Sequence, residues 1–375
     1  MIKSIHIENF KSFANFELSE LGRFTCIIGL NGSGKTTLLQ ALDFIGCLAN
    51  GVSSFRGWGK TEIATIGQNV RTCTFAVTFD HDDKNACDMQ WKGKYNIQLE
   101  RFTEESVTRD NVPILQLKDG KLTMIGSTDK ILPFNVGSLN YQGSILNILN
   151  TQMPDIDYVR DQLRQLRSID LLSPESLRKA SQGDTELGMG GIGMPGFLNS
   201  LSEQDARELL QELKLFYPTL NDYSIKRRRF GWKRLLVRES ALGKVALPAH
   251  QVNDGFLRVL AMLSQRYSRN EFLLFDEVEN GINQEILGLL VEKLQSFPGK
   301  QVVITTHSAL LVNYLADETA RKSLIFLYKD KLGHTHGMRF FDIEGIADRL
   351  EVLGPGEVMG SVNLTELAEK MSSRA

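Results

Sequence analysis

Long hydrophobic runs are missing from this sequence. No apolar stretch approaches the roughly 18 to 20 residues that a helix needs to cross a bilayer, and the first residues lack the apolar core of a signal peptide. Cysteine is also scarce: four residues are scattered without CxxC spacing, which is typical of reduced thiols in the cytosol. We therefore predict a cytoplasmic protein that has no disulfide framework and does not engage a membrane.

The chain also lacks a strong excess of charge of either sign. Its formal net charge is −2, which argues against a protein that coats nucleic acid along its whole surface, although a local basic patch stays compatible with it. A length of 375 residues with 42% hydrophobic residues is enough to bury a large core. Length alone predicts two or three structural units.

The most informative segment is GLNGSGKT, residues 29–36. It follows a short apolar strand at 24–28 and precedes helical apolar spacing over 36–48, which is the strand, loop and helix context of a phosphate-binding loop. Lys35 is expected to face the β- and γ-phosphates, and the Thr36 hydroxyl is expected to bind Mg²⁺. ATP and Mg²⁺ are thus the predicted cofactors. The predicted ATP-binding residues of this loop are Gly29, Asn31, Gly32, Ser33, Gly34, Lys35, Thr36 and Thr37.

A second motif, FLLFDE at 272–277, ends an apolar strand with two carboxylates. Asp276 is predicted to hold the same Mg²⁺ ion, directly or through water. Glu277 stands beside the metal carboxylate, where a general base for an attacking water belongs. The pair therefore predicts an ATPase that hydrolyses ATP rather than only storing it.

A third motif, VVITTHS at 302–308, predicts a buried strand that ends in His307. Ser308 is placed to cap a helix that begins at Ala309. We interpret His307 as a sensor of the γ-phosphate, with a purely structural histidine after a strand as the alternative. The predicted catalytic residues are then Lys35, Glu277 and His307.

Hydrophobic patterning divides the chain into three parts. Residues 1–145 show strand-like alternation around the glycine-rich loop, including an expected strand at 95–102. Residues 146–220 carry helical spacing and contain the glycine-rich segment 188–196, which we expect to form a mobile tip. Residues 221–375 alternate strand and helix after a hairpin, which predicts a parallel sheet covered by helices. The predicted fold class is α/β.

The two phosphate motifs are far apart in sequence, since Lys35 and Asp276 are separated by 276 − 35 = 241 positions. The opening MIKSIHIENFKSF, followed by GLNGSGKTTLLQAL, resembles the ABC-type ATPases of the SMC, RecF and OLD (overcoming lysogenization defect) group. A stand-alone OLD-like ATPase without a Toprim nuclease domain fits best. The resemblance implies an ABC-type P-loop ATPase head with an antiparallel β subdomain and a helical insertion. It also implies that Lys11 and Ser12 touch the nucleotide, the alternative being a strand end in solvent.

The same resemblance implies a signature element before the metal strand, and Val252 to Leu263 (VNDGFLRVLAML) is the candidate. Its first residues, Asn253, Asp254 and Gly255, would contact the γ-phosphate of the opposite subunit. Transporters and SMC heads have a sequence closer to LSGGQ, so Asn253 replaces the expected serine and a plain helix cap is the alternative. Gln142 is the candidate Q-loop ligand of the metal, and residues 279–281 lie where a D-loop belongs.

These assignments imply a homodimer or higher homo-oligomer that closes around ATP. The resemblance further implies a separate effector protein, expected to be a nuclease, in phage defence or genome maintenance. Asp155 and Asp157 form a DxD pattern, but they precede a helix, so we interpret them as helix-capping acids rather than a nuclease site. A RecF-type clamp that acts directly on DNA is the alternative function, and a transporter subunit is a third that the weak signature disfavours.

The sequence leaves two interpretations of one basic segment open, which are contact with nucleic acid and an ordinary solvated hairpin. The candidate is a basic strand pair interleaved with Phe230 and Trp232, which could follow a phosphate backbone. Its predicted contact residues are Lys226, Arg227, Arg228, Arg229, Lys233 and Arg234.

Overall fold

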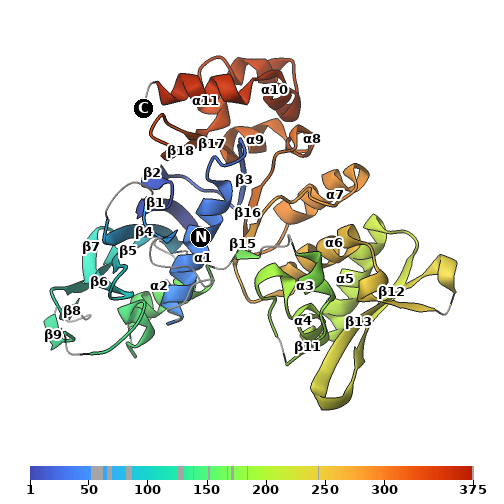
Figure 1. The fold of residues 1–375 in the computed structure, drawn as a ribbon, viewed down its shortest axis with the longest axis horizontal. Helices are drawn as coiled ribbons and strands as arrows, with labels where there is room; N and C mark the ends of the chain where they lie inside the picture. The colour runs from blue at the N-terminus through green and yellow to red at the C-terminus, as the bar shows by residue number, and fades with distance from the viewer. Residues whose placement is uncertain are drawn as a thin grey trace. The chain divides into compact units, whose positions relative to one another are not determined.

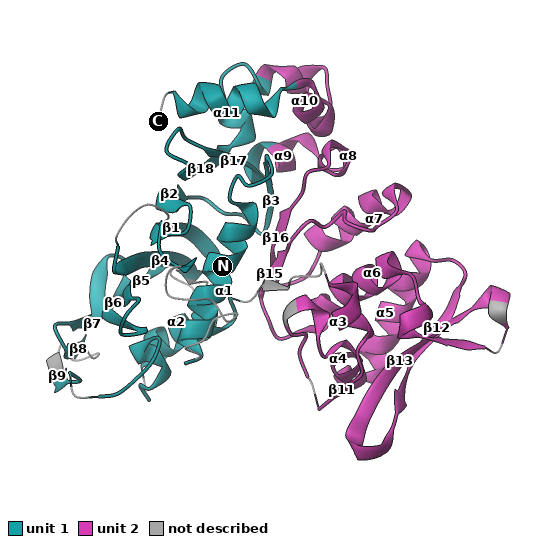
Figure 2. Cartoon of the chain, in the orientation of Figure 1, with its two compact units in different colours: residues 1–167, 321–347, 362–375 teal, residues 168–320, 348–361 magenta. Residues whose placement is uncertain are grey.

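The chain forms two compact units in a computed structural model (Figures 1 and 2). The structure describes residues 1–51, 62–65, 70–81, 87–125, 131–137, 139–150, 153–166, 168–169, 173–183, 185–243 and 245–373. Unit 1 comprises residues 1–167, 321–347 and 362–375, and unit 2 comprises residues 168–320 and 348–361. The three sequence domains, 1–145, 146–220 and 221–375, stay a prediction.

A large antiparallel sheet dominates unit 1. Its strand order is β2-β1-β4-β5-β6-β7-β8-β9. The strands are β1 (Ile2–Phe10), β2 (Phe13–Leu18), β4 (Thr72–His81), β5 (Cys87–Asn96), β6 (Arg101–Arg109), β7 (Val112–Lys118), β8 (Lys121–Ile125) and β9 (Ile131–Asn135). β1 and β2 pair antiparallel as a hairpin, with Ile7 opposite Phe16.

Aromatic side chains join this sheet to the helix that follows the glycine-rich loop. The ring of Phe44 on that helix lies 5.6 Å from Phe10, 5.9 Å from Phe75 and 5.2 Å from Tyr95. Phe10, Phe44 and Phe75 are fully buried. Such aromatic pairs contribute about 0.5–1.5 kcal/mol beyond their buried area. The sheet is therefore packed against the helix that follows the glycine-rich loop.

The expected strand at 95–102 is wrong. β5 ends at Asn96, residues 97–100 form turns, and β6 begins at Arg101. The Asn96 carboxamide oxygen accepts hydrogen bonds from the N–H groups of Gln98 and Leu99, both at 3.0 Å. An asparagine side chain that bonds to the backbone two residues on replaces ladder bonds with a turn. Apolar and polar residues alternate through the turn as they would in one continuous strand, so the sequence pattern did not reveal the turn.

The P-loop region of unit 1 is built from strands and helices in the predicted order. β3 (Phe24–Gly29) leads into α1 (Lys35–Ala49), and both predicted elements are confirmed. β17 (Leu324–Lys329) pairs parallel with β3 and antiparallel with β18 (Thr335–Arg339). The helices α2 (Pro154–Arg164) and α11 (Leu364–Ser372) complete the unit.

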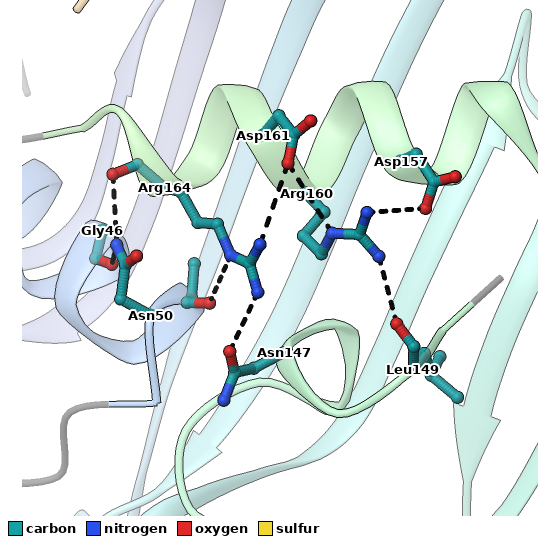
Figure 3. A network of polar contacts seen from close by, with 9 residues as sticks. Gly46, Asn50, Asn147, Leu149, Asp157, Arg160, Asp161 and Arg164 are labelled. Atoms are coloured by element: carbon teal, nitrogen blue, oxygen red, sulfur yellow. Dashed lines mark hydrogen bonds and ion pairs between the residues drawn. The ribbon is translucent and has the colours of Figure 1, made fainter.

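Polar contacts from α2 fix the carboxyl end of α1 (Figure 3). Arg164 donates to the Asn147 carboxamide at 3.0 Å, and Asn50 donates to the Arg164 carbonyl at 3.1 Å. Arg160 pairs with Asp157 at 2.8 Å. Asp155 and Asp157 both lie in the first turn of α2, where negative charge complements the helix dipole, but the N-cap residue is Met153 and no side-chain hydrogen bond caps the helix, so the capping role is wrong.

Unit 2 contains the second half of the strand and helix alternation. β10 (Ser168–Ile169), β15 (Phe272–Phe275) and β16 (Gln301–Thr305) pair in parallel. α7 (Gln284–Gln295) connects β15 to β16 and begins at an Asn283 cap. The Ser308 hydroxyl accepts the Leu311 N–H at the start of α8 (Ala309–Val312), as predicted. The parallel connection expected from residues 272–308 is thus confirmed.

A second, antiparallel sheet of unit 2 has the order β11-β13-β12, with β14 on β13. Its strands are β11 (Ser181–Gln182), β12 (Leu220–Arg227), β13 (Trp232–Glu239) and β14 (Ala246–Pro248). The remaining helices of this unit are α3 (Pro174–Arg178), α4 (Met194–Ser200), α5 (Glu203–Phe216), α6 (Asp254–Ser264) and α10 (Pro355–Ser361), while α9 (Asp317–Ser323) leads into unit 1. The predicted hairpin at 223–239 is confirmed.

The predicted mobile tip at 188–196 is wrong. Much of this segment is buried, and α4 starts within it at Met194. A Cβ placed on Gly191 would lie 2.1 Å from the Leu177 side chain, and the Gly196 N–H donates to Ser181 at 2.8 Å. The glycines here permit close packing and positive φ angles rather than a surface tip.

Candidate nucleotide site

The glycine-rich loop connects β3 to α1 with its backbone tightly enclosed. A Cβ on Gly29 would lie 2.4 Å from the Leu327 carbonyl oxygen. Gly34 has a φ of 112°, and a Cβ there would lie 2.6 Å from the Thr335 hydroxyl. Gly34 also has no side chain with which to cap α1. The loop therefore brings backbone N–H groups and an uncapped helix start together, which is the arrangement that binds phosphate.

Lys35 already lies inside this loop. Its ammonium donates to the carbonyls of Gly29 and Leu30 at 2.9 and 3.0 Å, and the residue is only 6% exposed. Thr36, the predicted Mg²⁺ ligand, is exposed in the first turn of α1. The Ser33 hydroxyl is buried without a hydrogen-bond partner among the described residues. A buried polar atom of this kind usually signals a ligand or an ordered water.

Thr335, the first residue of β18, links two predicted nucleotide-binding segments. Its hydroxyl lies 2.8 Å from Ser12 Oγ and 2.9 Å from the Ser33 carbonyl oxygen. Lys11 instead donates to Gln40 on α1 at 2.9 Å. Ser12 is therefore placed beside the loop, whereas Lys11 lies along the helix. Nothing in the sequence around Thr335 indicated this role.

A pocket of about 330 Å³ borders the loop within unit 1. One wall is formed by residues 30–33 of the loop itself. The other lining residues come from the turn after β17 and from α11 and its start: Tyr328, Lys329, Asp330, Lys331, Thr365, Ala368, Glu369 and Ser372. The phosphate loop thus faces open space, as a ligand site requires.

That Gln142 binds the metal stays a prediction. The Ser144 N–H donates to the Leu48 carbonyl at 3.1 Å, so residue 144 lies at the carboxyl end of α1. With a rise of 1.5 Å per residue, Leu48 is about 18 Å along the helix from Thr36. The segment that follows Gln142 also has a structural role. Buried Glu105 accepts hydrogen bonds from Trp91 Nε1 at 2.8 Å, from the Ile145 N–H at 2.9 Å and from the Ser144 hydroxyl.

In unit 2, Asp276 follows β15 and is 4% exposed. The buried Thr305 hydroxyl, at the end of the neighbouring strand β16, donates to the Asp276 carboxylate and accepts the Glu277 N–H at 2.9 Å. Glu277 has a φ of 46°, a left-handed conformation that non-glycine residues seldom adopt. Local strain of this kind clusters at functional sites. The sequence analysis assigned Thr305 no role, and the threonine pair directly before His307 is the signal that could have indicated one.

The expected D-loop contacts both predicted catalytic residues of unit 2. The His307 N–H donates to Glu279 Oε1 at 2.7 Å, and Asn280 donates to Glu277 Oε2 at 3.4 Å. His307 is exposed, and Glu277 is half-buried. Glu277 and His307 are thus held through residues 279 and 280 of one short segment. The sequence had indicated only that residues 279–281 lie where a D-loop belongs.

The signature candidate begins α6 as expected. The Asn253 side chain accepts the Phe256 N–H at 3.3 Å, so it caps the helix. Arg178 donates to the Asp254 carboxylate and to the Val252 carbonyl. A Cβ on Gly255 would lie 2.5 Å from the Gly281 carbonyl oxygen. The helix start therefore packs directly against the D-loop, with the charge of Asp254 balanced by an arginine.

Two predicted metal ligands, Asp276 and Thr36, carry oxygen atoms of the kind that bind Mg²⁺. Among the described residues, no group of three or more His, Cys, Asp and Glu side chains gathers as a metal cage. Mg²⁺ in nucleotide sites is typically held by one or two protein oxygens together with phosphate oxygens and water. The Asp276 carboxylate and the Thr36 hydroxyl are oxygens of this kind, and their binding of one Mg²⁺ ion stays a prediction.

Comparison with known proteins places the chain in a family. Residues 4–229 match the model of the AAA domain family AAA_23. The chain belongs to this family. It is 26% identical to structural maintenance of chromosomes protein 2 of Dictyostelium discoideum over 41% of this chain and 13% of that protein. It is 34% identical to the Gallus gallus protein of that name over 27% of this chain and 9% of that one. The chain spans less than a fifth of these relatives.

Solved structures show the fold. An SMC head bound to the C-winged helix domain of ScpA matches with a TM-score of 0.57 and 13% identity, over 91% of this chain and 99% of that one. The Smc head with an extended coiled coil, bound to the C-terminal domain of ScpA derived from Pyrococcus furiosus, matches with 0.53 and 11%, over 93% and 99%. The predicted ABC-type ATPase head of the SMC-like kind and its α/β fold are confirmed, and the narrower assignment to stand-alone OLD-like ATPases stays a prediction. Among the described residues, none of the helices combines the length and apolarity needed to span a membrane.

Proposed function

We propose that this chain is an ATP-binding and ATP-hydrolysing head that pairs with a second copy around ATP and thereby controls a partner protein. The observation that carries the proposal is the hydrogen-bonded centre of Asp276, Thr305 and Glu277. A chain that only stores nucleotide has no need for a carboxylate held in a left-handed conformation beside the metal aspartate.

The residues of the chain have distinct parts in this reaction. Lys35 shifts from the loop carbonyls to the β- and γ-phosphate oxygens, and the N–H groups at the start of α1 hold the remaining oxygens. Thr305 donates to the Asp276 carboxylate and so fixes the group that would hold Mg²⁺. Glu277 accepts the proton of the attacking water. His307, whose backbone Glu279 fixes, contacts the γ-phosphate.

Pairing requires the start of α6 to reach the phosphate of the other copy. Asn253 is exposed, and because its carboxamide oxygen caps the helix, its amide nitrogen is the group that donates to the γ-phosphate. Arg178 neutralises Asp254 next to it, which removes a repulsion toward the triphosphate. Asn280 of the D-loop contacts Glu277, and Gly281 of the same loop packs against Gly255. A shift of Glu277 after hydrolysis can therefore move the start of α6. ATP would then act as a dimerisation switch.

The partner is proposed to be a separate effector protein. Both SMC head structures named above contain part of ScpA, a different polypeptide, and this supports a head that works through a bound protein. Resemblance to stand-alone OLD-like ATPases favours a nuclease as the effector, in phage defence or genome maintenance. The alternative is a RecF-type ATPase that binds DNA itself, which the basic hairpin of unit 2 favours.

Light scattering on the Glu277→Gln variant tests the proposal. With saturating Mg²⁺ and ATP we expect a dimer mass, with ADP a monomer mass, and turnover at least about 100-fold below wild type. The matched control is Glu292→Gln, an exposed glutamate of α7, which should turn over ATP like wild type. Monomers of Glu277→Gln under saturating Mg²⁺ and ATP would refute the pairing, and unchanged turnover would refute the role of Glu277 as base.

A further inference from the structure

The β12–β13 hairpin projects from unit 2 as a long two-stranded ribbon (Figure 2). Six of the nine residues from 226 to 234 are lysine or arginine and none is acidic, in a chain whose net charge is −2. Among the described residues, no carboxylate lies within ion-pair distance of these six side chains. The hairpin end is therefore a concentrated, unneutralised positive charge.

The pairing register of the two strands places like charges opposite one another. Arg227 lies directly opposite Lys233, and Lys226 lies directly opposite Arg234. Like charges in directly opposed positions destabilise an antiparallel pair. The folded hairpin therefore carries two adjacent repulsive pairs, which a bound polyanion would relieve.

The apex of the hairpin presents an aromatic ring to solvent. Phe230 is 90% exposed and has a φ of 59°, so it combines an unburied apolar ring with a strained backbone. Gln182 of β11 donates to the Phe230 carbonyl at 2.8 Å, and the Arg228 N–H donates to the Trp232 carbonyl at 2.7 Å. The apex is thus held in this conformation by specific hydrogen bonds.

Beside the apex lies a pocket of about 540 Å³. It is lined by Ala180, Arg228, Arg229, Trp232 and Arg234. Three guanidinium groups around an indole that is 43% exposed provide donors for phosphate oxygens and a face for stacking. A nucleotide unit offers both features, whereas an acidic peptide offers only the negative charge.

We propose that this hairpin is a binding site for unpaired nucleotides of a nucleic acid strand, with bases stacking on Phe230 and Trp232 and phosphates on the arginines. Single strands are favoured over duplex because the stacked base pairs of a duplex cover the base faces that the aromatic rings would contact. Stacking contributes about 1–3 kcal/mol per base irrespective of sequence. The site needs neither bound ATP nor a second copy, so it stands apart from the proposed switch.

Fluorescence anisotropy of the full chain tests this proposal, using labelled oligo-dT of about 20 nucleotides and a duplex of the same length. The single strand should bind at least about tenfold more tightly than the duplex. Phe230→Ala should weaken single-strand binding by about 5- to 150-fold without changing its salt dependence. Arg228→Ala with Arg229→Ala should lower the slope of log affinity against log salt by about 1.4, since each phosphate contact contributes about 0.7.

The controls are two exposed residues of α5 in the same unit, Leu215→Ala for the aromatic and Arg207→Ala for the arginines, which should bind like wild type. Equal or tighter duplex binding, or no effect of Phe230→Ala, would overturn the proposal. So would equal competition by polyglutamate, which would indicate an acidic protein partner. Because Lys35→Ala removes nucleotide binding but spares the hairpin, retained single-strand binding by that variant separates this proposal from the ATP switch.

Discussion

The buried Thr305 hydroxyl donates a hydrogen bond to the Asp276 carboxylate. Because the same hydroxyl accepts the Glu277 N–H, one side chain at the end of β16 positions both carboxylates that follow β15. Hydrogen bonds to charged groups contribute about 1.5–3 kcal/mol. The placement of these two carboxylates thus depends on a residue of the neighbouring strand.

Thr305→Val should therefore lower ATP turnover by about 10- to 100-fold, because the isosteric valine keeps the volume and removes the hydroxyl. Nucleotide binding without Mg²⁺ should not change. Steady-state turnover at increasing Mg²⁺ concentration measures the effect. Thr305→Ser retains the hydroxyl and should recover most of the activity; a serine variant as slow as the valine variant would show that packing, not the hydroxyl, matters.

Lys35→Ala should weaken ATP binding by at least about 100-fold, because the only charge within the loop that faces the phosphates is lost. Titration calorimetry with ATP measures the affinity. Lys94→Ala is the matched control, since Lys94 pairs with Glu104 on the antiparallel sheet and is away from the loop. Retained tight ATP binding by Lys35→Ala would contradict the assignment of the phosphate loop.

Gly255→Ala should prevent ATP-dependent pairing while each copy still binds nucleotide. An added methyl group would lie 2.5 Å from the Gly281 carbonyl, so α6 or the D-loop must shift. Light scattering in the Glu277→Gln background detects the loss of the dimer. Gly360→Ala is the control, because a methyl group there meets only a 3.9 Å contact. A normal dimer of Gly255→Ala would show that α6 does not take part in pairing.

Local sequence signals identified the elements that carry the site. The order strand, glycine-rich loop and helix at 24–48 and the apolar strands before Asp276 and His307 are short-range patterns, and the structure has them where predicted. Asn96 shows where this reasoning fails. Whether a residue continues a strand or turns it depends on its side-chain hydrogen bonds, which apolar alternation does not encode.

Long-range contacts could not be predicted from the sequence. Thr335 approaches Ser12 across 323 positions, and Ser144 approaches Leu48 at the carboxyl end of α1. The glycines of 188–196 were interpreted by composition as a mobile tip, although their close packing depends on Leu177 in α3. Each failure involves a partner that only the folded chain supplies.

Glu105 makes stability depend on pH. Burial raises the pKa of its carboxyl group to about 7, against the opposing hydrogen bonds from Ser144, Trp91 and the Ile145 N–H. Between the ordinary carboxyl pKa of 4.5 and about 7, the folded protein retains a proton that the unfolded chain has released. Stability should therefore fall as pH rises through this interval, by about 3 kcal/mol in total, and stay low above it.

Glu105→Gln should remove this dependence, because an amide does not titrate, and should also cost stability at pH 5, because an amide cannot accept from Trp91, Ser144 and Ile145 together. Urea unfolding at pH 5 and pH 8 measures both effects. Glu104→Gln changes the neighbouring residue of the same strand, which is solvent-accessible and pairs with Lys94, and should keep the wild-type pH dependence. If Glu105→Gln loses as much stability as wild type between the two pH values, the destabilising charge lies elsewhere.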